Sequence, residues 1–144
     1  MSTPQTLKEN HLVVLDDDPV ARQLIAAWLE PRGWVTHAID DPHLAEATLR
    51  STASGVLFTD IEMPCRSGLE VVKSIRENAD LSDVFVIVIS AHADTARVQQ
   101  AMAAGADEYL SKPFEFDRLV ELTGEASMAV RLCNAERTEN RSTA

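Results

Sequence analysis

Three aspartates, one serine and one lysine stand directly after hydrophobic runs of this sequence. Asp16 and Asp17 follow the first run, Asp60 follows the third, Ser90 ends the fourth and Lys112 comes soon after the fifth. Carboxylates that are held close together repel each other, so they need a positive charge nearby to stay ionised. Hard carboxylate oxygens suit Mg²⁺, which keeps several waters and takes few protein ligands. We therefore expect a Mg²⁺ site if these residues meet.

The same residues also suit phosphoryl chemistry. Lys112 offers a point charge for a phosphate oxygen, and Ser90 offers a hydroxyl donor. One of the carboxylates is then available as a nucleophile, because Asp can form an aspartyl phosphate. Positioning and charge neutralisation are what phosphoryl transfer chiefly requires. Considered one at a time, however, each acid could equally be a helix cap or turn residue with no role in such a site.

The elements that must position these residues alternate between strand and helix. Apolar runs predict strands, and segments with a helical apolar period between them predict helices. This alternation is typical of an α/β fold with one doubly wound parallel sheet and helices on both faces. The carboxyl ends of parallel strands lie at one edge, where ligands bind, so the polar residues should converge there. The predicted strands cover residues 11–15, 34–39, 55–60, 84–89 and 108–110, and the predicted helices begin near residues 19, 42, 67, 94 and 116.

The apolar face of each helix should pack on the sheet. The helix at residues 94–104 has the weakest such face, because its apolar side chains are only Val98, Met102 and alanines. We therefore expect it to be the element most able to shift. Gly124 is expected to weaken the last helix, because glycine costs about 1 kcal/mol relative to alanine inside a helix. Other side chains that we expect to point inward include Val20, Leu44, Ala47, Leu49 and Met128.

Composition narrows the class of protein. The 144 residues carry a formal net charge of −10, which argues against nucleic-acid binding because phosphate contacts need clustered Lys and Arg. No apolar stretch approaches the roughly 20 residues of a membrane helix, and residues 1–10 lack the apolar centre of a signal peptide. We expect a cytoplasmic protein with a flexible leader at 1–10, one domain at 11–133, and a polar tail at 134–144 with no output domain.

Several motifs occur together in a fixed order. Paired acids end the first strand, and the segment Asp60-Ile61-Glu62-Met63-Pro64-Cys65-Arg66-Ser67-Gly68 follows the third. Ser90-Ala91 follows the fourth strand, and residues 104–114 contain Ser111-Lys112-Pro113-Phe114. In these features the chain resembles the receiver domains of two-component response regulators. The resemblance implies the flavodoxin-like strand order 2-1-3-4-5.

The resemblance also implies a role for each site residue. Asp60 would accept a phosphoryl group from a phosphohistidine on a sensor histidine kinase or phosphotransfer protein. Mg²⁺ would be held by Asp16, Asp17, Asp60 and the backbone carbonyl of Glu62. Phosphate contact and switching would involve Ser90, Ala91, Tyr109, Lys112 and Pro113, with a cis peptide bond before Pro113. A downstream protein would bind the face formed by the 94–104 helix, the fifth strand and the last helix.

One enzyme class remains as an alternative. Phosphatases and phosphotransferases of the haloacid dehalogenase type also use a nucleophilic Asp after a buried strand. They need a second Asp two residues later as general acid, whereas this chain has Glu62 there. The receiver reading instead implies a signalling module that catalyses only its own phosphorylation and dephosphorylation.

Overall fold

A computed structural model describes residues 6–92 and 94–142, and its centre is one parallel five-stranded sheet. The strand order is β2-β1-β3-β4-β5, which confirms the predicted α/β fold and its order. Neighbouring strands pair in parallel throughout, so all five carboxyl ends point the same way. The strands are β1 (Lys8–Leu15), β2 (Val35–Ile39), β3 (Ser54–Asp60), β4 (Phe85–Ser90) and β5 (Glu108–Ser111).

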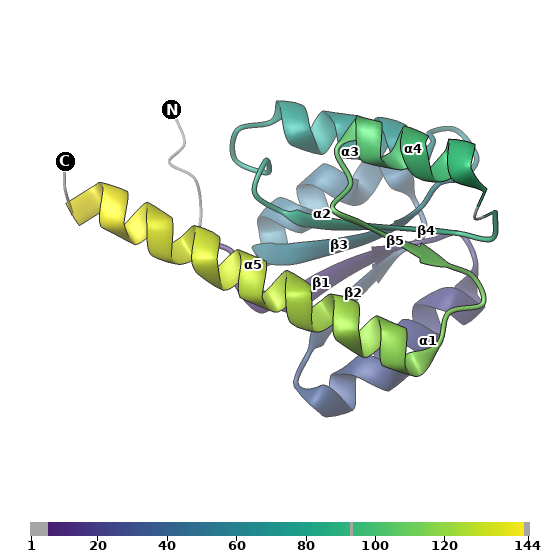
Figure 1. Cartoon of the computed structure of the whole chain (residues 1–144), viewed down its shortest axis with the longest axis horizontal. Helices are drawn as coiled ribbons and strands as arrows, with labels where there is room; N and C mark the ends of the chain where they lie inside the picture. The colour runs from purple at the N-terminus through teal and green to yellow at the C-terminus, as the bar shows by residue number, and fades with distance from the viewer. Residues whose placement is uncertain (1–5, 93, 143–144) are drawn as a thin grey trace.

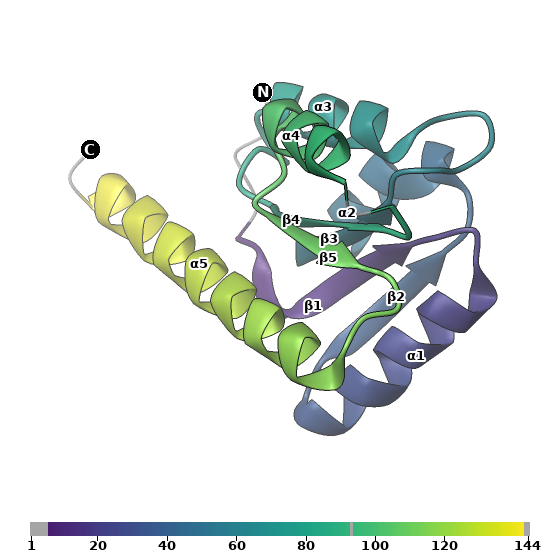
Figure 2. The ribbon, with the colours of Figure 1, turned by 45° about the vertical axis from the view of Figure 1, so that its right-hand side comes forward.

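Helices cover both faces of the sheet. Figures 1 and 2 show α1 and α5 on one face, and α2, α3 and α4 on the other. Short 3₁₀ turns at Glu30–Arg32 and Pro42–Leu44 lie on either side of β2. No helix among the described residues is both long and apolar enough to cross a membrane. The helices are α1 (Pro19–Leu29), α2 (Ala45–Thr52), α3 (Gly68–Glu77), α4 (Thr95–Ala104) and α5 (Phe116–Ser142).

Burial follows the strand order. Every residue of β3 is buried, and so are five of the six residues of β4, because helices cover both sides of these central strands. β2 contains no fully buried residue and forms the sheet edge, as its more amphipathic sequence predicts. The acid at the end of β3 therefore belongs to a fully buried central strand.

Side-chain caps begin the helices that follow β1, β3 and β4. The Asp18 carboxylate accepts a hydrogen bond from Val20 N at the start of α1, as predicted for a cap. The Ser67 hydroxyl accepts hydrogen bonds from the first turn of α3, and the Asp94 carboxylate accepts one from Arg97 N. These caps satisfy backbone N–H groups in the first turns of three helices that begin at the carboxyl edge of the sheet.

Both ends of the fold differ from the sequence expectation. β1 begins at Lys8, inside the segment assigned to a flexible leader, and residues 1–5 of that segment lie outside the described residues. Lys8 N donates a hydrogen bond to the Ala53 carbonyl, and this contact adds the early residues to the sheet. Strand pairing of this kind leaves no trace in a local apolar pattern.

The last helix is longer than predicted. α5 continues unbroken past Gly124 to Ser142, through residues 134–142 that the sequence assigned to a polar tail, and its end extends beyond the sheet (Figure 1). The Asn134 side chain exchanges two hydrogen bonds with the backbone of Leu7, and Arg131 pairs with Glu9. Polar contacts to residues 7 and 9 thus hold the part of α5 around residues 131–134 against the start of β1.

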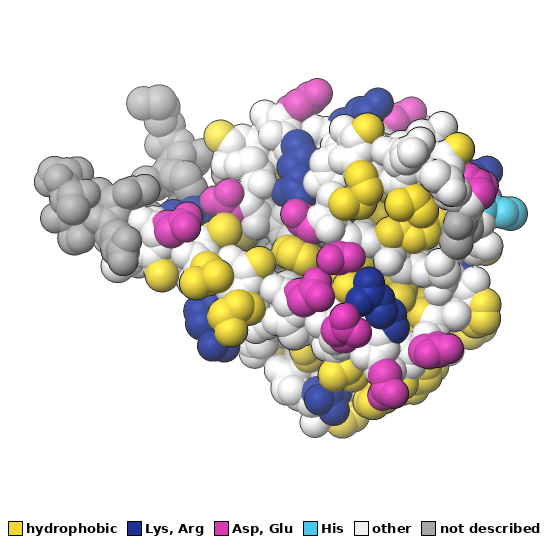
Figure 3. Space-filling model, in the orientation of Figure 1, with side chains coloured by type: hydrophobic (Ala, Val, Ile, Leu, Met, Phe, Trp, Pro, Cys, Tyr) yellow, Lys and Arg dark blue, Asp and Glu magenta, His cyan; other side chains and the backbone are white. Residues whose placement is uncertain are grey.

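Five side chains that were expected to face inward are exposed instead. On α2 the buried positions are Ala45 and Leu49, because the 3₁₀ turn before the helix shifts the phase and turns Leu44 and Ala47 outward. Hydrophobic side chains are visible along α5 in Figure 3, and Leu132 is a further exposed one. The exposed residues that correct the prediction are Val20, Leu44, Ala47, Met102 and Met128.

Candidate functional site

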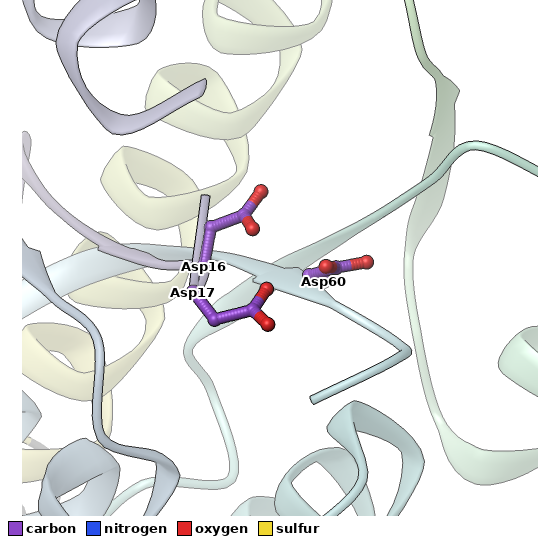
Figure 4. A group of neighbouring side chains, drawn as sticks. All are labelled: Asp16, Asp17 and Asp60. Carbon is purple, nitrogen blue, oxygen red and sulfur yellow. The ribbon is translucent and has the colours of Figure 1, made fainter. Parts of the chain in front are cut away.

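Three carboxylates meet at the carboxyl edge of the sheet. Asp16 and Asp17 follow β1, Asp60 ends β3, and one oxygen from each lies within 4.8 Å of the others. Figure 4 shows the side chains of Asp16 and Asp17 turned toward the side on which Asp60 lies. The sequence prediction that these acids converge is therefore confirmed, and they form a compact set of hard oxygen donors.

Asp16 is the most deeply buried member of this set. Its carboxylate is fully buried, and one oxygen, Oδ1, accepts a hydrogen bond of 2.9 Å from Asp18 N. The other oxygen, Oδ2, lies 2.7 Å from Lys112 Nζ, so a positive charge already faces it. A buried carboxylate needs such compensation. Together with Asp17 and Asp60 it offers hard oxygen donors of the kind that fit Mg²⁺.

Lys112 supplies the positive charge of the site. Its ammonium lies 2.7 Å from Asp16 Oδ2 and 3.6 Å from Asp60 Oδ2. Burial lowers the pKa of Lys112, but its contacts with the two aspartates outweigh burial and leave the pKa raised. Lys112 therefore remains protonated at neutral pH and faces the two carboxylates from the end of β5.

The surroundings of Asp60 disfavour the ionised form of its carboxyl group. Burial, followed by the nearby charge of Asp16, raises the pKa of Asp60 to about 6, although Lys112 and a 3.4 Å hydrogen bond from Glu62 N oppose the rise. A cation would favour the ionised form by removing much of the repulsion. The ionised carboxylate is also the form that can act as a nucleophile.

The raised pKa predicts a specific pH dependence of folding. In metal-free protein, the folded state binds the Asp60 proton more tightly than the unfolded state, so ionisation destabilises the fold progressively as pH rises from the ordinary aspartate pKa of 3.8 to about 6. The Asp60→Asn variant should therefore gain stability over the wild type, by about 1–3 kcal/mol at pH 7.5, by about half as much at pH 5 and by little below about pH 4. Urea unfolding in EDTA at several pH values measures this difference.

The comparison with the variant is necessary because other groups titrate in the same range. Burial lowers the pKa values of His11 and His37, so these residues reduce the stability of both proteins as pH falls below about 6.5. Their contribution cancels in the difference between wild type and variant. Mg²⁺ should shrink the difference by stabilising the ionised wild type, and a difference that does not vary with pH would contradict the assigned pKa.

The remaining predicted site residues belong to β4, β5 and the connections that follow them. Ser90 is buried at the end of β4, and its hydroxyl accepts a hydrogen bond of 3.0 Å from His92 N. Tyr109 is half-buried, and its hydroxyl donates a hydrogen bond of 2.6 Å to the His92 carbonyl. Ala91 is exposed next to Ser90, and the peptide bond between Lys112 and Pro113 is cis, as expected.

Glu62 is exposed, and its side chain points to α4. Its carboxylate forms an ion pair with Arg97, and His92 Nε2 lies 3.6 Å from the second carboxylate oxygen. Sequence reasoning did not identify Arg97, because the two paired residues are 35 positions apart and belong to different elements. Nothing in a local pattern reports such a contact.

Gly68 is a second residue whose role the sequence did not reveal. It begins α3, and a Cβ atom at this position would lie 1.9 Å from the carbonyl oxygen of Asp60. Gly68 N also donates a hydrogen bond of 2.9 Å to the Ile61 carbonyl, which fixes this close approach. The sequence signal that could have pointed to this role was a glycine in the first turn of a predicted helix, since glycine has a low helix propensity.

Comparison with known proteins agrees with this geometry. A family model described as the response regulator receiver domain matches residues 12–123. The C4-dicarboxylate transport transcriptional regulatory protein DctD of Pseudomonas aeruginosa is 32% identical over 130 residues, covering 90% of this chain and 28% of that protein. Transcriptional regulatory protein FixJ of Bradyrhizobium diazoefficiens is 31% identical over 114 residues, covering 79% of this chain and 55% of that protein.

A solved structure shows the same arrangement of elements. The receiver domain of the Francisella response regulator 1452 has 27% sequence identity and a TM-score of 0.76, and the match covers 83% of this chain and 97% of that domain. By contrast, this chain spans little more than half of FixJ and under a third of DctD. The similarity therefore concerns one domain of these regulators.

Proposed function

We propose that Asp60 accepts a phosphoryl group from a phosphohistidine, since the chain belongs to the response regulator receiver domains of two-component systems. The observation that carries this proposal is the convergence of Asp60 with Asp16, Asp17 and Lys112 from three separate strands. Within the described residues these acids form the one group of three or more candidate metal ligands. Neither caps nor turns explain why they meet.

Each residue has a defined task in the transfer. An Asp60 carboxylate oxygen attacks the phosphorus, the P–N bond to the donor imidazole breaks, and that imidazole keeps the electron pair. Lys112 balances charge on the phosphoryl oxygens from the position that it holds near Asp60 Oδ2. Asp16, Asp17, Asp60 and the Glu62 carbonyl are the residues that would hold Mg²⁺. The metal supplies charge neutralisation for the phosphoryl group.

The transferred group would then act on the neighbouring loop. An aspartyl phosphate carries about −1.5 to −2 charge in place of the single charge of the carboxylate, and it presents several strong acceptor oxygens. Ser90 has a hydroxyl hydrogen to donate to such an oxygen, and this movement would change its contact with His92. Since the Tyr109 hydroxyl also binds His92, the change would reach β5 and the face formed by α4, β5 and α5. We propose this face as the docking surface for a downstream protein.

The proposal describes a signalling module rather than an enzyme with an external substrate. Its partners are a sensor histidine kinase or phosphotransfer protein upstream and a protein target downstream. A cytoplasmic setting is part of the proposal, and the two free thiols, Cys65 and Cys133, fit a reducing compartment. The haloacid dehalogenase alternative is not retained, because the family match is to receiver domains and Glu62 pairs with Arg97 instead of pointing toward Asp60.

Phosphorylation by a small donor tests the proposal. Wild-type protein incubated with acetyl phosphate should gain one phosphoryl group in the presence of Mg²⁺, and should remain unmodified in EDTA. Intact mass spectrometry measures the modification, and peptide mapping should place it in the peptide that contains Asp60. Labelling that persists without divalent metal, or that maps to another residue, would refute the site.

A further inference from the structure

An ion pair joins the phosphoacceptor loop to α4. Arg97 lies in the first turn of α4, and its Nη1 contacts Glu62 Oε1 in the loop that follows β3. The same guanidinium has its Nε 3.7 Å from the Asp94 carboxylate at the N-cap of α4. His92 Nε2 lies 3.6 Å from the other oxygen of Glu62. The Glu62 carboxylate is thus the point where the loop, the β4 end and α4 meet.

This carboxylate is closely tied to Asp60. Glu62 N donates a hydrogen bond of 3.4 Å to Asp60 Oδ1, and Ile61 N donates one of 3.2 Å to the Ile89 carbonyl. The acceptor side chain is therefore hydrogen-bonded to the backbone of the residue whose carboxylate pairs with Arg97. A change of charge at Asp60 occurs two residues from the partner of Arg97.

α4 has little else to hold it in place. Among its residues only Ala101 and Ala104 are buried, while Met102, the one large apolar side chain besides Val98, is exposed. Two buried alanines remove little apolar surface from water, and hydrophobic stabilisation scales with that area. A polar contact at the start of α4 consequently accounts for a larger share of its attachment than it would in a well-packed helix.

We propose that Arg97 is a positioning residue that, through Glu62, holds α4 against the phosphoacceptor loop in the unphosphorylated state. This inference rests on the proposed function and adds a regulatory contact to it. An aspartyl phosphate at residue 60 carries about −1.5 to −2 charge where the ionised carboxylate carries −1, so the negative charge close to Glu62 increases. Repulsion between this charge and the Glu62 carboxylate displaces the carboxylate from Arg97, so the ion pair weakens and α4 is freed to move.

Substitution of Arg97 tests this contact in the whole chain. Arg97→Gln should increase hydrogen exchange in residues 95–104 of the unphosphorylated protein. It should also raise the apparent affinity for beryllofluoride with Mg²⁺, a stable phosphoryl mimic, about two- to five-fold, the range typical of one partly exposed ion pair. Arg97→Lys keeps the charge and should restore most of the wild-type behaviour.

A matched control separates this effect from the general loss of a surface ion pair. Arg50, near the end of α2 and just before β3 begins, pairs with Asp80 at 2.6 Å, so this pair lies at the edge of the sheet opposite the site. Arg50→Gln should leave both the beryllofluoride affinity and exchange in residues 95–104 at wild-type values. If Arg97→Gln behaves like Arg50→Gln in both measurements, the proposed role of Arg97 is wrong.

A double-mutant cycle identifies Glu62 as the partner. If Arg97 acts through Glu62, the effects of Arg97→Gln and Glu62→Gln on beryllofluoride affinity and on hydrogen exchange should not be additive. The double variant should then match Arg97→Gln in both measurements. Additive effects would overturn the inference. Failure of the wild type to bind beryllofluoride with Mg²⁺ would instead count against the function proposed for Asp60, so the two ideas fail in distinguishable ways.

Discussion

Replacing Asp60 by asparagine is expected to reduce phosphorylation by acetyl phosphate and Mg²⁺ to background. The amide side chain carries no negative charge, and it cannot form the acyl phosphate that an aspartate forms. The substitution also removes one of the three carboxylates that lie within 4.8 Å of one another, so Mg²⁺ affinity should fall as well. Intact mass spectrometry and isothermal titration with MgCl₂ measure these two losses.

Folding is not expected to suffer from this change. Asparagine has nearly the size of aspartate, and in metal-free protein it removes the repulsion between Asp60 and Asp16 that contributes to the raised pKa. A variant that is at least as stable as the wild type but takes up no phosphoryl group separates chemistry from structure. Asp117→Asn, at an exposed position near the start of α5, is the control that should label normally. Retained labelling of Asp60→Asn would refute Asp60 as the acceptor.

The site itself could be predicted from the sequence because it depends on strand ends alone. Alternation of strand and helix requires parallel strands, and parallel strands bring their carboxyl ends to one edge. Asp16, Asp60 and Lys112 need no further information to be placed together, and the structure places Lys112 Nζ within 3.6 Å of both carboxylates. The resemblance then supplied a specific chemistry for this group.

Features that depend on contacts between distant residues could not be predicted in this way. The polar end of α5 has no apolar period, and its position follows from hydrogen bonds between Asn134 and Leu7 across 127 residues. Leu44, which was expected to point inward, is exposed and Ala45 is buried because a 3₁₀ turn precedes α2 and changes its phase. Side-chain pairs such as Glu62 and Arg97 are equally invisible to a local pattern.

Gly68→Ala is the second substitution with a large expected effect. An alanine Cβ would lie 1.9 Å from the Asp60 carbonyl oxygen and 2.8 Å from its carbonyl carbon, so the backbone at the end of β3 or the start of α3 must move. Overpacking of this kind should destabilise the protein by about 2–3 kcal/mol, measured by urea unfolding. The displaced Asp60 should also bind Mg²⁺ more weakly, which calorimetry can detect.

Two opposite effects on the free energy of unfolding compete in Gly68→Ala. The clash with Asp60 lowers it, whereas alanine favours a helix over glycine by about 1 kcal/mol and raises it, so the sign of the change shows which effect is larger. Gly124→Ala, within α5, provides the matched control, since no atom within 4 Å would meet its Cβ. That variant should be stabilised by about 0.5–1 kcal/mol and should phosphorylate like the wild type. Opposite signs at the two glycines would show that residue 68 must lack a side chain so that α3 can begin against the backbone of Asp60. A stabilised Gly68→Ala variant with normal phosphorylation would instead mean that this close approach places no constraint on the site.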